Sequence, residues 1–248
     1  MRQVILMVLI VAAPGATWAQ TDPPLVVRHG HYFVVVNEGD GTPTISAQSR
    51  AYYTYPDDLE VQVIDDHSRI VLERIVAMDG SMEQQIPDEP APLYLVLAEP
   101  GMNGVIFGAD RPWGVVAAGS YGLGSSGKAP VLYLYVPPEC EQLNINARAT
   151  SPREGIRLVV TDSQGGEVLV IDGEADALVE EQMAVPESER GKVWTFTLSD
   201  PQTAEARLDD IQLWVEGYVA PLLWPDAAWA GTHGPMIWQR HKAELDAE

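Results

Sequence analysis

The sequence is poor in cysteine and in lysine. Cys140 is its only cysteine among 248 residues, so no disulfide can form within the chain. Only three of the 15 basic residues are lysine, against 36 acidic residues, and the formal net charge is -21. Nucleic-acid binding needs clustered Lys and Arg side chains, so nucleic acid is disfavoured as a partner. Stability must come from packing or from a bound ion.

Long hydrophobic runs are also absent after the first twenty residues. Met1 and Arg2 form a short positive start, and the apolar run Val4–Ala13 follows. This run is too short to cross a hydrocarbon layer of about 30 Å. Small residues then lead to a plausible cleavage site after Ala19. We therefore expect residues 1–19 to be a signal peptide, and the mature chain to be secreted or periplasmic with no transmembrane segment.

Motifs for nucleotide binding and for a serine nucleophile are missing or incomplete. Gly122–Lys128 fits the pattern G-x-G-x-x-G, but this motif holds phosphate only where a helix follows. Here Pro130 and the alternating segment VLYLYV follow at once, which predicts a flexible loop between two domains. No G-x-S-x-G segment is present, so the sequence leans away from an enzyme without deciding the question.

What the sequence does contain is period-two alternation, most clearly in Lys192–Gly217. Trp194, Phe196 and Leu198 share one parity, and later Ile211, Leu213 and Val215 do the same. Short runs of this kind indicate strands with one buried face. We therefore expect an all-β protein made of two antiparallel, jelly-roll-like sandwiches.

The second half of the chain repeats features of the first half at a nearly constant distance. Three landmarks recur 97, 99 and 100 residues later, in the pairs Val63 and Val160, Pro87 and Pro186, and Tyr94 and Trp194. This offset indicates an internal duplication. We place the two sandwiches at residues 20–125 and 126–222. Residues 223–248 form an aromatic and acidic tail, with a weak helical pattern in Pro235–Ala247.

Trp214 is the residue that best indicates a binding site. If Ile211, Leu213 and Val215 face the core, Trp214 lies on the outer face with Gln212 and Asp210. An outward indole with polar neighbours can stack on a sugar ring, which makes these three residues a candidate carbohydrate site. The alternative is that the tail packs over this face and covers Trp214.

Carboxylates and two histidines are the candidate metal ligands. No certain cofactor is indicated, but the acidic surplus and the lack of disulfides favour calcium, with Asp162 and Asp209 as ligands from separate loops. His29 and His31 would share one face of a strand and could bind a metal together. The sequence identifies no third ligand for them.

The second half resembles a family of accessory modules. The segments that carry the resemblance are VLYLYVPP, IRLVVTDSQGG, GKVWTF and LDDIQL, within Val131–Gly217. They resemble the β-sandwich modules of secreted bacterial hydrolases, namely the pre-peptidase C-terminal type and carbohydrate-binding jelly rolls. The resemblance implies non-catalytic binding, sometimes with calcium. We therefore expect a secreted protein that binds carbohydrate or a cell-surface glycan. The alternatives are an envelope-associated protein-interaction module and a hydrolase with a site between the two domains.

Overall fold

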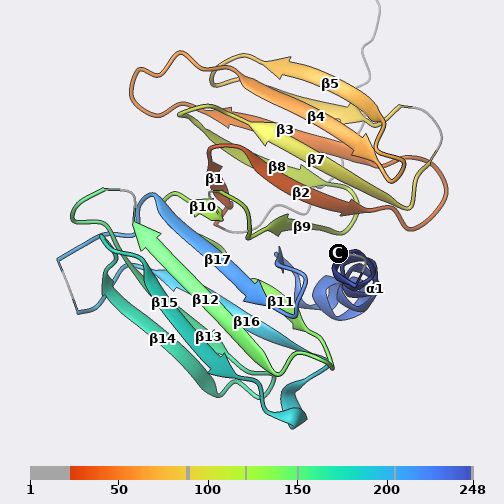
Figure 1. Ribbon diagram of the computed structural model, residues 1–248. Helices are drawn as coiled ribbons and strands as arrows, with labels where there is room; N and C mark the ends of the chain where they lie inside the picture. Colours follow the sequence, from red (N-terminus) through yellow and green to blue (C-terminus); the bar gives the residue numbers. More distant parts are fainter. Residues whose placement is uncertain (1–22, 88–89, 121, 150, 204, 247–248) are drawn as a thin grey trace, which may run out of the picture.

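The protein is an all-β sandwich with one C-terminal helix (Figure 1). The structure is a computed structural model that describes residues 23–246 except 88–89, 121, 150 and 204. The expected signal peptide lies outside the described residues. Every strand pair is antiparallel, as the alternation predicts.

The first layer is a sheet of eight strands. Both halves of the chain contribute four strands, and the two groups join where β1 pairs with β10. The order across the sheet is β15 (Val179–Ala184), β12 (Gln142–Ala149), β17 (Ile211–Gly217), β10 (Leu123–Ser125), β1 (Val26–Arg28), β8 (Gly104–Ala109), β3 (Thr44–Arg50) and β6 (Ser81–Gln85).

The second layer is a sheet of ten strands, five from each half. The halves join where β9 pairs with β18. The order is β14 (Glu167–Glu174), β13 (Gly155–Thr161), β16 (Lys192–Ser199), β11 (Leu132–Val136), β18 (Leu222–Trp224), β9 (Trp113–Val116), β2 (His31–Val36), β7 (Leu93–Glu99), β4 (Leu59–Asp65) and β5 (Ile70–Val76).

The two halves have the same topology. Each strand of the first half, β1 to β9, corresponds to the strand nine places later, β10 to β18. In both sheets, corresponding strands follow in the same order from the central joint to the edge. The hairpins β4–β5 and β13–β14 even share a register shift, after Val63 and after Val160. This agreement supports the internal duplication that the spacing predicts. Because both sheets continue from one half into the other, the division into two separate domains stays a prediction.

A single hydrophobic core runs between the sheets through both halves. The inward residues of β4 and β17 are fully buried, and so are Trp113 and Trp194. In the first half, Phe33 stacks on Phe107 with 4.3 Å between ring centroids. Cys140 is buried and free, and burial raises the pKa of its thiol. Aromatic packing of this kind holds the fold without a disulfide.

The C-terminal helix α1 (Ala227–Leu245) packs on the ten-stranded sheet beside the joint between the halves (Figure 1). Asp226 caps it by accepting hydrogen bonds from the backbone N–H groups of Ala228 and Trp229. The helix comes so close to β11 that a Cβ on Gly234 would lie 2.4 Å from that of Tyr135. No helix in residues 23–246 is long and apolar enough to cross a membrane.

Two carboxylates, Glu139 and Glu38, form polar contacts with α1. Glu139 accepts hydrogen bonds from Trp238 Nε1 at 3.0 Å and from Lys242 Nζ at 2.8 Å. The bond from Lys242 is the main reason that the pKa of Glu139 is lowered. His233 Nδ1 lies 3.0 Å from Glu38 Oε1, which links the helix to the first half. The tail is therefore part of the fold.

Two sequence expectations need correction. The helix begins at Ala227 and contains Pro235, whereas the spacing of apolar residues predicted a start at Pro235. That spacing does not take into account Asp226, which caps the helix. Residues 123–125 of the glycine-rich segment form buried strand β10, which pairs with β1 and β17, and not a flexible loop. Gly122 has a φ of 58°, which lets the chain turn into that strand.

Candidate functional site

Trp214 lies on the outer face of the eight-stranded sheet, as the alternation predicts. Ile211, Leu213 and Val215 are buried on the inner face, whereas the side chain of Trp214 is half-buried on the other. Its Nε1 donates a hydrogen bond to the carbonyl of Gly119 at 2.9 Å. A Cβ on Gly122 would lie 2.9 Å from the indole, so the missing side chain leaves room for the ring beside β10. The indole is thus held in a fixed position.

The segment that covers part of the indole belongs to the β9–β10 connection and not to the tail. Gly119 and Gly122 lie in that connection, while α1 packs on the opposite sheet. The expected alternative, in which the tail packs over Trp214, is therefore wrong. The indole is left with part of its surface open on a sheet face whose inner side is core.

Polar side chains from two neighbouring strands extend this face. Asn146 of β12 is the direct cross-strand partner of Trp214, and Asn144 is the partner of Glu216. Glu180 and Gln182 of β15 follow as the next partners outward. The polar residues of these three strands line a hollow of about 280 Å³, namely Asn144, Asn146, Glu180, Glu181, Gln182 and Glu216. We call this surface, made of Trp214, Asn144, Asn146, Glu180, Gln182 and Glu216, the Trp214 face.

The chemistry of the Trp214 face suits a ligand rich in hydroxyl groups. Asn146 Nδ2 donates to Glu216 Oε2 at 3.2 Å, which orients both side chains. Amides both donate and accept hydrogen bonds, while carboxylates only accept, so the row matches groups that can do both. A rigid aromatic ring beside such a row provides an apolar platform next to polar contacts.

Of the three predicted carbohydrate residues, Trp214 and Gln212 lie on the outer side of β17, and Asp210 does not. Gln212 is two residues from Trp214 on the same side of β17 and pairs with Arg148. Asp210 precedes the strand with a φ of 48°, and its carboxylate forms an ion pair with Arg28. The backbone turn at Asp210 ends the alternation, so the parity argument does not extend to it.

Asp210 belongs to a second hollow, at the joint between the halves. Arg28 is buried there, donates to the carbonyl of Met102 at 2.8 Å and lies 4.9 Å from the Tyr52 ring centroid. Tyr53, which is 89% exposed, contacts Tyr55 edge to face. This tyrosine pocket of about 370 Å³ is lined by Arg28, His29, Tyr52, Tyr53, Tyr55 and Asp210, among others.

The two histidines of the predicted metal pair do not act together. His29 has a φ of 66° between β1 and β2, so the chain turns there and the expected shared strand face is broken. His29 lines the tyrosine pocket, where burial, followed by the charge of Arg28, lowers its pKa. His31 is only 2% exposed and accepts a hydrogen bond from the Gly124 N–H at Nε2. Its Nδ1 donates to the carbonyl of His29.

These bonds also define the charge state of His31. With one ring nitrogen accepting and the other donating, the imidazole is neutral. Burial lowers its pKa to about 4. A buried neutral imidazole with both nitrogens bonded to backbone is not available to a metal ion or to a substrate. His31 is therefore not available to the hydrolase site that the sequence offers as an alternative.

The predicted calcium ligands lie at opposite ends of the second half. Asp162 follows β13, and its Oδ1 accepts hydrogen bonds from the backbone of Gln164 and Gly166. Asp209 lines the tyrosine pocket together with Glu154, which immediately precedes β13. A seven-residue strand is roughly 20 Å long, so the two carboxylates cannot hold one ion.

A different cluster satisfies the distance criterion for a metal site. Among the described residues, Asp65, Asp66 and His67 place their ligand atoms within 4.8 Å of one another. Asp65 already accepts bonds from the backbone N–H groups of His67 and Arg69 and pairs with the Arg69 guanidinium at 2.7 Å. This carboxylate closes the β4–β5 turn, which explains its position without an ion.

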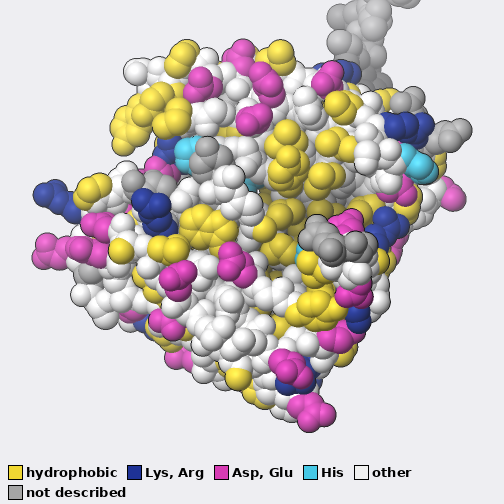
Figure 2. Space-filling model, viewed as in Figure 1, with side chains coloured by type: hydrophobic (Ala, Val, Ile, Leu, Met, Phe, Trp, Pro, Cys, Tyr) yellow, Lys and Arg dark blue, Asp and Glu magenta, His cyan; other side chains and the backbone are white. Residues whose placement is uncertain are grey.

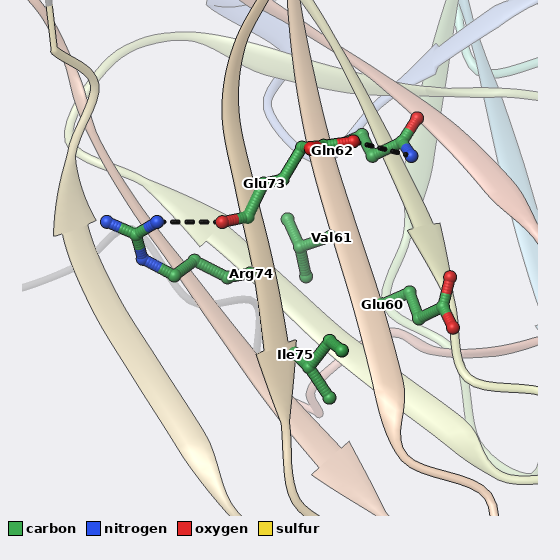
Figure 3. Close-up of a pocket in the computed structure, with 6 residues that line it drawn as sticks. All are labelled: Glu60, Val61, Gln62, Glu73, Arg74 and Ile75. Atoms are coloured by element: carbon green, nitrogen blue, oxygen red, sulfur yellow. Dashed lines mark hydrogen bonds between the residues drawn. The ribbon is translucent and has the colours of Figure 1, made fainter.

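One further hollow lies on the β4–β5 hairpin at the edge of the ten-stranded sheet (Figure 3). It measures about 460 Å³ and is lined by Glu60, Val61, Gln62, Glu73, Arg74 and Ile75. Gln62 Nε2 donates to Glu73 Oε1, and Arg74 Nη1 donates to the Glu73 carbonyl. Gln62 and Arg74 thus bond to Glu73, and these polar groups do not point together toward one ligand position.

Sequence reasoning missed most of the Trp214 face. The available signal was the alternation in Gln142–Ala149, where Leu143, Ile145 and Ala147 are buried and the asparagines face outward. Recognition of that strand would have placed both asparagines on an outward face, although its pairing with β17 does not follow from the alternation. Comparison with protein-family models and with curated proteins finds no match to this chain.

Proposed function

We propose that this chain is a secreted or periplasmic, non-catalytic binding protein for carbohydrate or a cell-surface glycan. The observation that carries the proposal is the half-buried, hydrogen-bonded indole of Trp214 beside a row of amide and carboxylate side chains. An anchored ring loses little conformational freedom on binding, and hydroxyl groups can satisfy the adjacent amides. The open sheet face also favours binding along a chain over enclosure of a reacting bond.

A glycan array with the mature protein tests this function. The Trp214→Ala variant should lose the signals that the wild type gives, because the platform is removed. The matched control is Tyr32→Ala, which removes an aromatic ring that is 44% exposed on the opposite sheet. Binding that survives in Trp214→Ala, or that is lost equally in both variants, would contradict the proposal.

A second candidate function is protein interaction at an envelope. Apolar side chains gather over the first half, next to α1 (Figure 2). On the ten-stranded sheet Tyr32, Ile70 and Ile75 are 44%, 54% and 72% exposed. Exposed apolar groups of this kind often mark a contact surface. An Ile70→Ser/Ile75→Ser variant should then lose co-sedimentation with envelope fractions while unfolding at the same urea concentration as the wild type. Unchanged sedimentation would reject this alternative.

A further inference from the structure

Among the described residues, three basic side chains without an ion pair line another hollow at the joint between the halves, next to the tyrosine pocket. It has a volume of about 450 Å³ and adjoins the tyrosine pocket, since Tyr52 and Asp209 line both. Arg50 comes from the end of β3 in the first half. Lys128 follows β10, and Arg207 lies in the β16–β17 connection of the second half. We call this hollow, defined by Arg50, Lys128, Arg207 and Tyr52, the cation pocket.

These three cations lack the ion pairs that six other described basic residues form. Of the other described Lys and Arg side chains, six form ion pairs with Asp or Glu, namely Arg28, Arg69, Arg157, Arg190, Lys192 and Lys242. Within the described residues, no hydrogen bond or ion pair involves the side chains of Arg50, Lys128 or Arg207. A chain with 15 basic and 36 acidic residues therefore leaves three cations without a carboxylate partner around one hollow.

The two carboxylates of the cation pocket accept hydrogen bonds from other residues of its lining and not from the three cations. Asp200 accepts a hydrogen bond from the Leu208 N–H at 2.9 Å. Asp209 accepts one from Ser126 Oγ, also at 2.9 Å. With three cations and two carboxylates the lining carries a local charge of 3 - 2 = +1, in a chain whose formal charge is -21. The hydrogen-bond donors of the cations are thus the groups left to meet a ligand.

We propose that the cation pocket binds an oxyanion, that is, a carboxylate, sulfate or phosphate group carried by a small ligand. Guanidinium groups match the geometry of such oxygens and can bind them through two parallel hydrogen bonds. The same pocket has an apolar side, formed by Pro23, Pro24 and Val26, together with the Tyr52 ring. This wall can contact the non-ionic part of the ligand. The site is independent of the Trp214 face and of its proposed glycan.

Isothermal titration of the mature protein with four small ligands tests this site. Sodium sulfate, inorganic phosphate and glucuronate carry the three oxyanions, and glucose is the uncharged counterpart of glucuronate. We expect at least one oxyanion to bind and glucose not to bind in this pocket. The ligand that binds identifies which oxyanion the pocket prefers. If none of the three binds at millimolar concentration, the proposal is wrong.

A charge-matched pair of variants assigns the binding to the pocket. Arg50→Gln/Arg207→Gln removes two pocket cations, and affinity should fall at least tenfold. Arg74→Gln/Arg240→Gln removes the same charge from β5 and α1, and affinity should stay as in the wild type. All four side chains are exposed, so neither variant should disturb folding. An equal loss of affinity in both variants would show that binding depends on net charge alone, and it would overturn the assignment to this pocket.

Discussion

The two halves of the molecule share their strand order but differ on their outer faces. Asn146 pairs with Trp214 in the second half, and the matching pair in the first half is Ser46 with Gly108. The inner faces of both halves remain apolar and buried. Packing constrains the side that faces the core, while the outer side can change without loss of the fold. The proposed recognition surface lies on the half whose outer face carries the larger polar and aromatic side chains.

The ten-stranded sheet shows a second difference. In the second half α1 covers the part of the outer face formed by β11, β16 and β18, and its Gly234 lies against Tyr135 of β11. In the first half, outward residues such as Tyr32 and Ile75 stay exposed. The duplication thus provides two copies of one frame, and each copy carries a different surface.

The largest expected effect concerns the joint between the halves. Arg28→Met leaves the Asp210 carboxylate without its cation and the Met102 carbonyl without its donor. Loss of one partner of a buried pair should lower the free energy of unfolding by about 3 kcal/mol. The matching position after β10 is Ser126, whose hydroxyl donates to Asp209, so Ser126→Ala should cost only about 1 kcal/mol. Urea unfolding measures both, and equal losses would show that the Arg28 pair does not hold the joint.

The next effect is the dependence of stability on pH that His31 contributes in the first half. His31 has a folded pKa of about 4, below its unfolded value of 6.5, and β11 has no histidine. Because the unfolded chain takes up the proton first, this stability is present above pH 6.5 and is lost as pH falls toward 4. The loss between pH 7 and pH 5 should be about 2 kcal/mol.

The control for this effect is His31→Gln, whose amide oxygen can still accept the Gly124 N–H. The variant should show a smaller decrease in unfolding free energy than the wild type over the same pH range. Carboxylates titrate alike in both proteins, so the difference isolates the imidazole. Equal decreases would show that His31 does not control this transition.

The matching hairpin turns provide a smaller test of the duplication. Asp65 and Asp162 each accept backbone N–H groups two and four residues later. Asp162→Ala should lower the free energy of unfolding by about 1 kcal/mol, since it removes two turn hydrogen bonds. Asp65→Ala should cost roughly twice as much, because Asp65 also pairs with Arg69. If Asp162→Ala lowers the free energy of unfolding more than Asp65→Ala does, the two aspartates do not stabilise their turns in the same way.

The sequence predicted the elements whose side chains alternate strongly. Trp194 and Trp214 lie where parity places them, because one face of each strand is core and the other is not. Strands β6 (SMEQQ) and β15 (VEEQMA) were missed, since edge strands need no continuous apolar face. The side-chain pattern also did not predict β10, where Gly124 lies against the Arg28 carbonyl and the His31 ring.

The candidate site was predictable in part. Parity alone gave Trp214 and Gln212, but the neighbours of Trp214 depend on which strand pairs with β17. Strand pairing over long distances is not encoded in local alternation. The same limit applies to Arg28 and Asp210, which are 182 residues apart in sequence and form an ion pair at the joint.

The last test concerns ligand binding at the outer surface of the second half, and not the stability of the fold. A saccharide identified on the array, titrated into ¹⁵N-labelled protein, should shift the Trp214 indole N–H signal and the amides of β12, β15 and β17. The matching amides around Ser46 and Gly108 should not shift. Trp214→Ala should weaken the affinity about tenfold, or about 1.4 kcal/mol. Shifts centred on the first half, or an unchanged affinity in Trp214→Ala, would contradict the assignment of recognition to the second half.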